Sequence, residues 1–118
     1  MLAYTVQLSD TVPQGADYDL AVYDKQPDKT PTNLSGCTAR FQLRRHVAAE
    51  ETDLDLSSDP ADGITIDTQA GRIDLHITAD RTAGLAGTYV GQLEISWPGG
   101  RVDRLLEATL RVSAEVVR

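Results

Sequence analysis

The sequence contains little cysteine, few aromatic residues and no long hydrophobic run. With one cysteine, Cys37, among 118 residues, no intrachain disulfide can form. No segment has the roughly 20 consecutive apolar residues of a membrane-spanning helix, and the first residues lack the apolar region of a signal peptide. We therefore expect a protein that is made and folded in a cytoplasm and does not insert into a membrane.

Positive charge is also scarce. The chain has 18 acidic and 11 basic residues, which gives a net charge of −7. A nucleic-acid-binding protein needs a basic surface that replaces the counterions of the phosphates, and an anionic membrane surface attracts basic segments in the same way. The sequence therefore argues against both nucleic acid and membrane as partners, and we interpret the acidity as a contribution to solubility.

Patterns typical of catalysis or metal binding are missing as well. No serine lies in a Gly-x-Ser-x-Gly elbow, and neither His46 nor His76 has a cysteine or carboxylate beside it in a metal-ligand spacing. The acidic segment 50–62 suggests calcium, but Ser58 and Ile64 occupy the positions where an EF-hand loop needs glycine and glutamate. We interpret this segment as a solvated loop, with a calcium site as the alternative. We predict no enzyme activity, metal or cofactor, and an inert thiol at Cys37.

The most informative feature that is present is an almost uninterrupted alternation of apolar and polar residues. It covers four segments, residues 37–44, 72–77, 88–97 and 102–112. Successive side chains of a strand point to opposite faces of a sheet, so each segment has one dry face and one wet face. This pattern is typical of antiparallel sheets that pack in two layers.

Turn residues divide the rest of the chain into further short strands. Besides the four segments, we predict strands at about 3–9, 17–23, 54–56 and 64–66, and a single helical turn near 79–85. The order Leu85, Gly87, Tyr89 resembles the corner of immunoglobulin-like domains, where a tyrosine begins a strand. We therefore predict that residues 1–118 form a single all-β domain, an immunoglobulin-like antiparallel β-sandwich of seven or eight strands.

Polar positions on three predicted strands define the candidate site, a protein interface. Arg40 and Arg44 lie on the wet face of one strand, and Val90 and Glu94 lie on the wet side of another. Leu105 occupies the wet phase of the last strand. If the three strands are neighbours, as in an immunoglobulin-like sheet, these five side chains form one face with mixed charge and two apolar residues. The alternative is an ordinary surface, because single exposed apolar residues are common.

From Thr30 onward the chain resembles a group of small bacteriophage and prophage structural proteins that are related to the N-terminal domain of the phage baseplate upper protein. The resemblance depends on segments 33–36 (NLSG), 38–44 (TARFQLR), 63–67 (GITID), 71–75 (GRIDL), 82–89 (TAGLAGTY), 92–95 (QLEI) and 100–107 (GRVDRLLE). It implies an immunoglobulin-like building block of a tail or baseplate that contacts copies of itself and other virion proteins. It brings no catalytic residues.

The expected function is therefore that of a non-enzymatic tail or baseplate protein. We expect it to be located in the virion, to be assembled in the cytoplasm of the bacterial host, and to form a homo-oligomer. The alternative is a module that binds carbohydrate or another ligand at a cell surface, because sandwiches often serve this purpose. The six aromatic residues lie mostly on apolar phases, which leaves few side chains for stacking on sugars.

Overall fold

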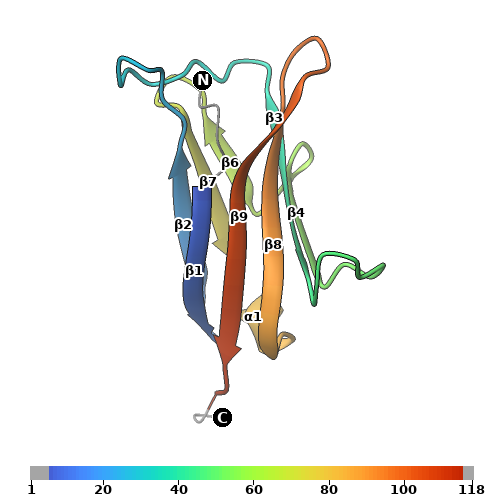
Figure 1. The fold of residues 1–118 in the computed structure, drawn as a ribbon. Helices are drawn as coiled ribbons and strands as arrows, with labels where there is room; N and C mark the ends of the chain where they lie inside the picture. Colours follow the sequence, from blue (N-terminus) through green and yellow to red (C-terminus); the bar gives the residue numbers. More distant parts are fainter. Residues whose placement is uncertain (1–5, 116–118) are drawn as a thin grey trace.

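The computed structural model describes residues 6–115, which form two β-sheets packed face to face (Figure 1). The strands are β1 (Val6–Pro13), β2 (Tyr18–Tyr23), β3 (Thr38–Arg44), β4 (Leu54–Ser58), β5 (Ala61–Asp62), β6 (Ile64–Asp67), β7 (Arg72–Ile77), β8 (Gly87–Ser96) and β9 (Val102–Ser113), and the helix is α1 (Ala79–Ala83). The large sheet has the order β1-β9-β8-β3-β4-β5, and the small sheet has the order β2-β7-β6. In Figure 1, β1, β9 and β8 lie in front of β7 and β6.

This strand order is that of an immunoglobulin-like sandwich, so the predicted fold class is confirmed. Counted along the chain, β3, β8 and β9 correspond to strands C, F and G, and β2, β7 and β6 to strands B, E and D. The additional strands β4 and β5 extend the large sheet beside β3, as in variable-type domains. Strand β1 pairs with β9 in parallel, from Val6 opposite Leu106 to Pro13 opposite Ser113, and so belongs to the large sheet.

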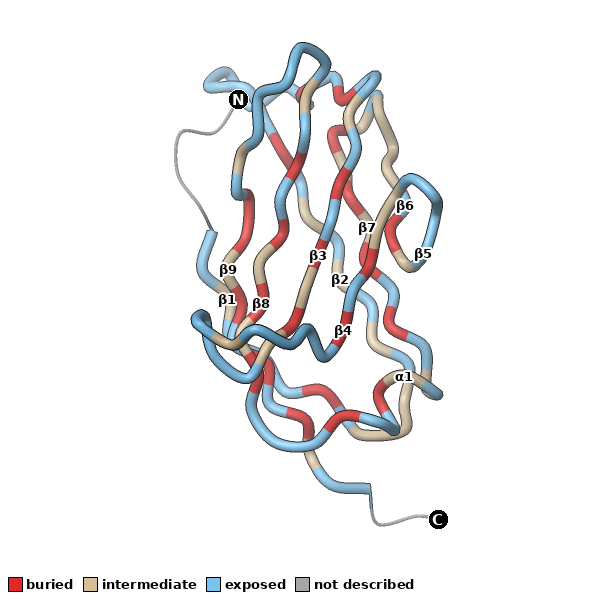
Figure 2. Tube along the Cα trace, turned by 90° about the vertical axis from the view of Figure 1, so that its right-hand side faces the viewer, coloured by how far each residue is buried: buried red, intermediate tan, exposed pale blue. Residues whose placement is uncertain are grey.

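The core follows the predicted alternation along most strands. Figure 2 shows buried and exposed residues alternating along them. Phe41 on β3 is 1% exposed and lies opposite Leu56 of β4 and Leu93 of β8, so it is the large residue between the layers, as expected. Gly91 leaves room for its ring, because a Cβ atom there would be 2.8 Å from the Phe41 ring.

The corner before β8 has the predicted tyrosine. Tyr89 is buried, and its hydroxyl accepts a hydrogen bond of 2.9 Å from the backbone N–H of Ala86. The guanidinium of Arg45 covers the ring, 4.2 Å from its centroid. The predicted helical turn is α1, which Thr78 caps by accepting from the N–H of Arg81. No helix within the described residues is long and apolar enough to cross a membrane.

A β-bulge corrects the prediction for Leu105. Leu93 of β8 pairs with Leu106 and Glu94 pairs with Arg104, so Leu105 is an extra residue of β9 between two consecutive pairs. Leu105 and Leu106 both face the core, at 4% and 3% exposure. The bulge also exchanges the inner and outer faces for the residues of β9 that precede it. Val102, which the alternation places on the dry face, is accordingly 54% exposed. The expectation that Leu105 lies on the outer face is therefore wrong.

Candidate protein-docking face

Four of the five predicted interface residues lie together on the outer surface of the large sheet. The register of β3 and β8 places Arg40 opposite Glu94 and Arg44 opposite Val90. Residues directly opposite each other in an antiparallel pair point to the same side of the sheet. The interpretation of these two wet faces as one surface is therefore confirmed, and Leu105 is the single residue that does not belong to it.

The surface is hollowed between β3, β8 and the loop that connects β3 to β4. The hollow has a volume of about 370 Å³, and its lining residues are Arg40, Gln42, Arg44, Val47, Val90, Gln92 and Glu94. We call this surface the docking face. Val47 comes from the loop and is 74% exposed, whereas Val90 on β8 is half-buried. Two aliphatic side chains therefore stand within a frame of charged and amide groups.

One side of the frame is an ion pair between β3 and β4. The guanidinium of Arg40 donates to both carboxylate oxygens of Asp55, from Nη2 to Oδ2 at 2.7 Å and from Nε to Oδ1 at 3.2 Å. Gln42 donates to the same carboxylate at 3.2 Å. The hydrogen bonds from Arg40 are the main cause that lowers the pKa of Asp55, and the same contact raises the pKa of Arg40. Both groups are therefore charged in ordinary buffers, and the two-point contact fixes their orientation.

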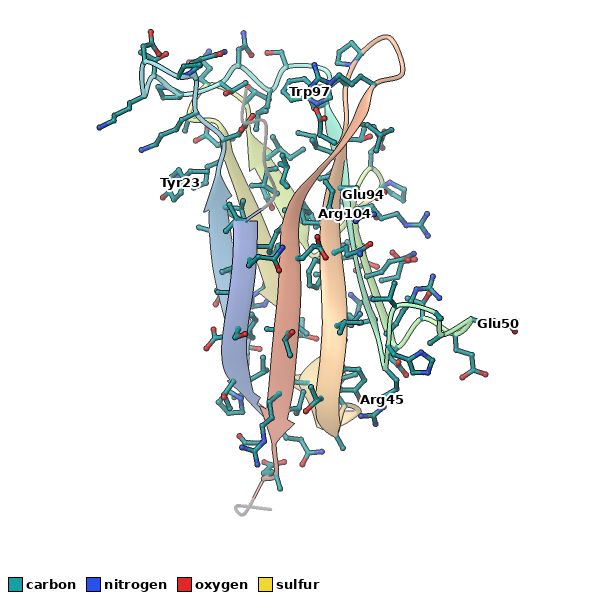
Figure 3. The ribbon with its side chains drawn as sticks, in the orientation of Figure 1. Tyr23, Arg45, Glu50, Glu94, Trp97 and Arg104 are labelled. Atoms are coloured by element: carbon teal, nitrogen blue, oxygen red, sulfur yellow. The ribbon has the colours of Figure 1, made fainter. Side chains whose placement is uncertain are left out.

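Arg44 holds the loop of residues 45–53 beside the sheet. Its Nη1 donates to the backbone carbonyls of Ala49 and Glu50 at 2.9 and 2.8 Å, and its Nη2 donates to Gln42 Oε1 at 3.0 Å. The loop thus keeps its shape through carbonyl contacts with a strand residue. Figure 3 shows Glu50 on the part of the loop that projects away from the sheet. Arg44 therefore helps to hold the loop that carries Val47 beside the hollow.

The opposite side of the docking face continues onto β9. Arg104 lies 3.9 Å from Glu94 and 4.0 Å from Glu107, and Figure 3 shows Glu94 and Arg104 beside each other. The face therefore combines the positive Arg40, Arg44 and Arg104 with the negative Asp55, Glu94 and Glu107. These charges balance, although the whole chain carries −7. A balanced face permits contact with an acidic protein, including a copy of this chain, with little repulsion.

Acidic side chains gather at a second hollow, of about 790 Å³, between β4 and α1. Its acidic lining residues are Asp53, Asp55, Asp59, Asp62 and Asp80. Asp62 is paired with Arg81 at 3.0 Å and Asp55 with Arg40. Within residues 6–115, no group of three or more histidine, cysteine or acidic side chains could hold a metal ion.

Cys37 directly precedes β3 and is half-buried. Burial and the nearby carboxylate of Asp24 raise the pKa of its thiol, in that order of size. Because the thiolate is the reactive form, this environment disfavours nucleophilic chemistry. Asp24 itself is 1% exposed, and neither of its carboxylate oxygens has a hydrogen-bond partner among the described residues. It lies apart from both hollows, whose lining residues do not include it.

Sequence reasoning misses Val47 and the pairing of His76. Val47 lies in a loop without periodicity, and contacts of the loop with β3, including those of Arg44, place it at the docking face. His76 Nδ1 lies 2.6 Å from Asp19 Oδ1 because β7 pairs with β2, and these residues are 57 positions apart. No local signal reveals either feature, since both depend on the tertiary arrangement.

Comparisons with known proteins add little to this description. No family model matches the chain, and no curated protein matches it. Among solved structures, a chain of the ZIG-8–RIG-5 IG1–IG1 heterodimer is similar, with 13% identity, a TM-score of 0.47, and coverage of 96% of this chain and 88% of that chain. Extracellular domains 3–5 of Drosophila OTK are similar with 16% identity, a TM-score of 0.38, and coverage of 92% and 33%. At these scores the fold assignment depends on the strand order described above.

Proposed function

We propose that this chain is a non-enzymatic structural protein of a bacteriophage or prophage tail, associated with the baseplate. It acts by docking on other proteins of the particle and on copies of itself, and its place is the virion assembled in the bacterial cytoplasm. The docking face is the surface that contacts the other virion proteins. Arg40, Arg44, Val90 and Glu94 belong to this surface, and Val47 joins them.

One observation carries the docking part of the proposal. Two aliphatic side chains are presented in a shallow hollow whose polar frame is already fixed by hydrogen bonds and ion pairs. A partner side chain that fills the hollow gains apolar contact while the frame loses little conformational freedom, and such preorganisation favours binding. No aromatic side chain lines the hollow, so stacking on a sugar ring has no support there. The assignment to a phage tail is supported by the sequence resemblance.

A binding experiment tests the docking face. The chain is co-expressed with the tail proteins encoded by adjacent genes, and complexes are measured after affinity capture and light scattering. Val90→Asp places a charge in the hollow, whereas Thr88→Asp places the same charge on the same face of β8, outside the lining residues. We expect capture by one defined tail protein to fall at least tenfold for Val90→Asp and to be unchanged for Thr88→Asp. Equal binding by both variants would contradict the docking face.

A further inference from the structure

Strand β2 has an open edge with little of the usual protection against pairing. In the small sheet β2 pairs with β7, and within residues 6–115 no strand lies on its other side. Natural edge strands are blocked by charged side chains, above all lysine, and by proline, bulges or short length. Strand β2 has six residues, YDLAVY, without proline, lysine or a bulge, and Asp19 is its one charged residue. By contrast, β5 has two residues, β6 has four, and β1 ends at Pro13.

The backbone groups that face this open edge follow from the pairing with β7. The N–H of Asp24 donates to the carbonyl of Gly71 at 2.7 Å, which continues the register in which Tyr23 lies opposite Arg72. Hydrogen-bonded and non-hydrogen-bonded pairs alternate along antiparallel strands. Asp19, Ala21 and Tyr23 are therefore in non-hydrogen-bonded pairs, and their N–H and C=O groups point away from β7.

We propose that β2 pairs with β2 of a second copy of this chain, antiparallel and about a two-fold axis at Ala21. In this register Ala21 lies opposite its own symmetry mate, and Asp19 lies opposite Tyr23 of the second copy. By symmetry, Tyr23 also lies opposite Asp19 of the second copy, which makes three pairs. Each pair exchanges two backbone hydrogen bonds, so about six bonds form. A register with Leu20 or Val22 on the axis would form only about four backbone hydrogen bonds between the two copies of the strand. The full use of the edge favours the Ala21 register.

The side chains are compatible with the same register. On the outer side, the carboxylate of Asp19 faces the exposed ring of Tyr23, which is 52% exposed, and not a second carboxylate. On the inner side, Leu20 lies opposite Val22 of the second copy. Both are only half-buried in the single chain, although they pack against its core. Pairing covers these side chains and joins the two small sheets into one continuous sheet, ordered β6-β7-β2-β2-β7-β6.

This edge is distinct from the docking face, so the inference adds a separate surface for the contact between copies that the proposed function includes. The docking face lies on β3 and β8 of the large sheet, whereas β2 is an edge of the small sheet. A protein with one heterologous docking face and one self-complementary edge brings two copies to each site of assembly. The two surfaces can therefore be tested by separate variants.

Sedimentation equilibrium of the full chain at submillimolar concentration tests the pairing. Ala21→Lys puts like charges opposite each other at the axis, and Thr65→Lys is the matched control. Ala21 and Thr65 both lie opposite Asp74, on the two sides of β7, so both lysines have the same neighbour. We expect a dimer for the unmodified chain and for Thr65→Lys, and a dissociation constant raised roughly tenfold or more for Ala21→Lys.

Chemical crosslinking provides a second readout that does not depend on charge. In a Cys37→Ser background, Ala21→Cys places two thiols beside the axis, where a short bis-maleimide links them, and Thr65→Cys is the control. We expect a covalent dimer for Ala21→Cys only. A chain that is monomeric at all concentrations, or crosslinking that is equal for both cysteines, overturns the inference. It is also overturned if Val90→Asp abolishes the dimer while Ala21→Lys leaves it intact, because self-association then uses the docking face.

Discussion

Replacing Leu105 by alanine tests the bulge that separates the structure from the simple alternation. Leu105 is 4% exposed and faces the core beside Leu106. Truncating a buried leucine removes its transfer free energy and leaves a cavity, which costs about 2–5 kcal/mol. For a chain of 118 residues, we expect Leu105→Ala to lower the midpoint of thermal unfolding by roughly 10 °C or more. Val102→Ala is the matched control, because Val102 is 54% exposed and should cost less than about 0.5 kcal/mol.

The assay is urea unfolding followed by circular dichroism, with thermal unfolding as a second measurement. The linear dependence of the unfolding free energy on urea gives the stability of each variant, and an unchanged slope shows that the two-state comparison is valid. The strict alternation predicts the opposite order, with Val102 costly and Leu105 nearly neutral. A stability loss for Val102→Ala that equals or exceeds the loss for Leu105→Ala would refute the bulge.

Two further predictions concern the polar frame of the docking face. Asp55 has a lowered pKa, so its contribution to stability is present above the pKa of the unfolded chain and is lost as the pH falls through the folded value. Arg40→Gln should raise the carboxyl pKa of Asp55 toward its ordinary value, which an NMR titration measures. An unchanged pKa would contradict the role of the ion pair. Arg44→Ala removes the contacts that hold the loop between β3 and β4, and we expect faster amide exchange in that loop alone. Exchange that stays as slow as in the unmodified chain would show that the loop is held by other contacts.

The alternation predicts the strands that build the core and the polar face of β3 and β8, because these strands follow the period of two without interruption. Phe41 and Val90 are therefore assigned correctly from the sequence. The same rule fails for β9, where one extra residue reverses the phase. Arg104 on the dry phase and the doublet Leu105-Leu106 are the local signs of this bulge, and the alternation alone does not show which leucine is the additional one.

Features that depend on contacts distant in sequence are beyond local pattern reasoning. The parallel pairing of β1 with β9 joins Val6 to Leu106, a hundred positions apart, and no periodicity encodes the partner of a strand. The open edge of β2 follows from this pairing, since β1 belongs to the large sheet. The hollow beside Val47 likewise requires the hydrogen bonds of Arg44 to loop carbonyls. The sequence thus identifies two strands of the docking face but neither the loop that completes it nor the edge that is left open.

The most direct test of the proposed role is the incorporation of the chain into particles. Particles are purified from a host in which the gene is replaced by the unmodified form, by Val90→Asp or by Thr88→Asp, and the protein is quantified by mass spectrometry against a tail-tube protein. We expect stoichiometric incorporation of the unmodified chain and of Thr88→Asp, and strong depletion of Val90→Asp. Particles that lack the unmodified chain, or that take up Val90→Asp at the same level, would contradict the proposed role.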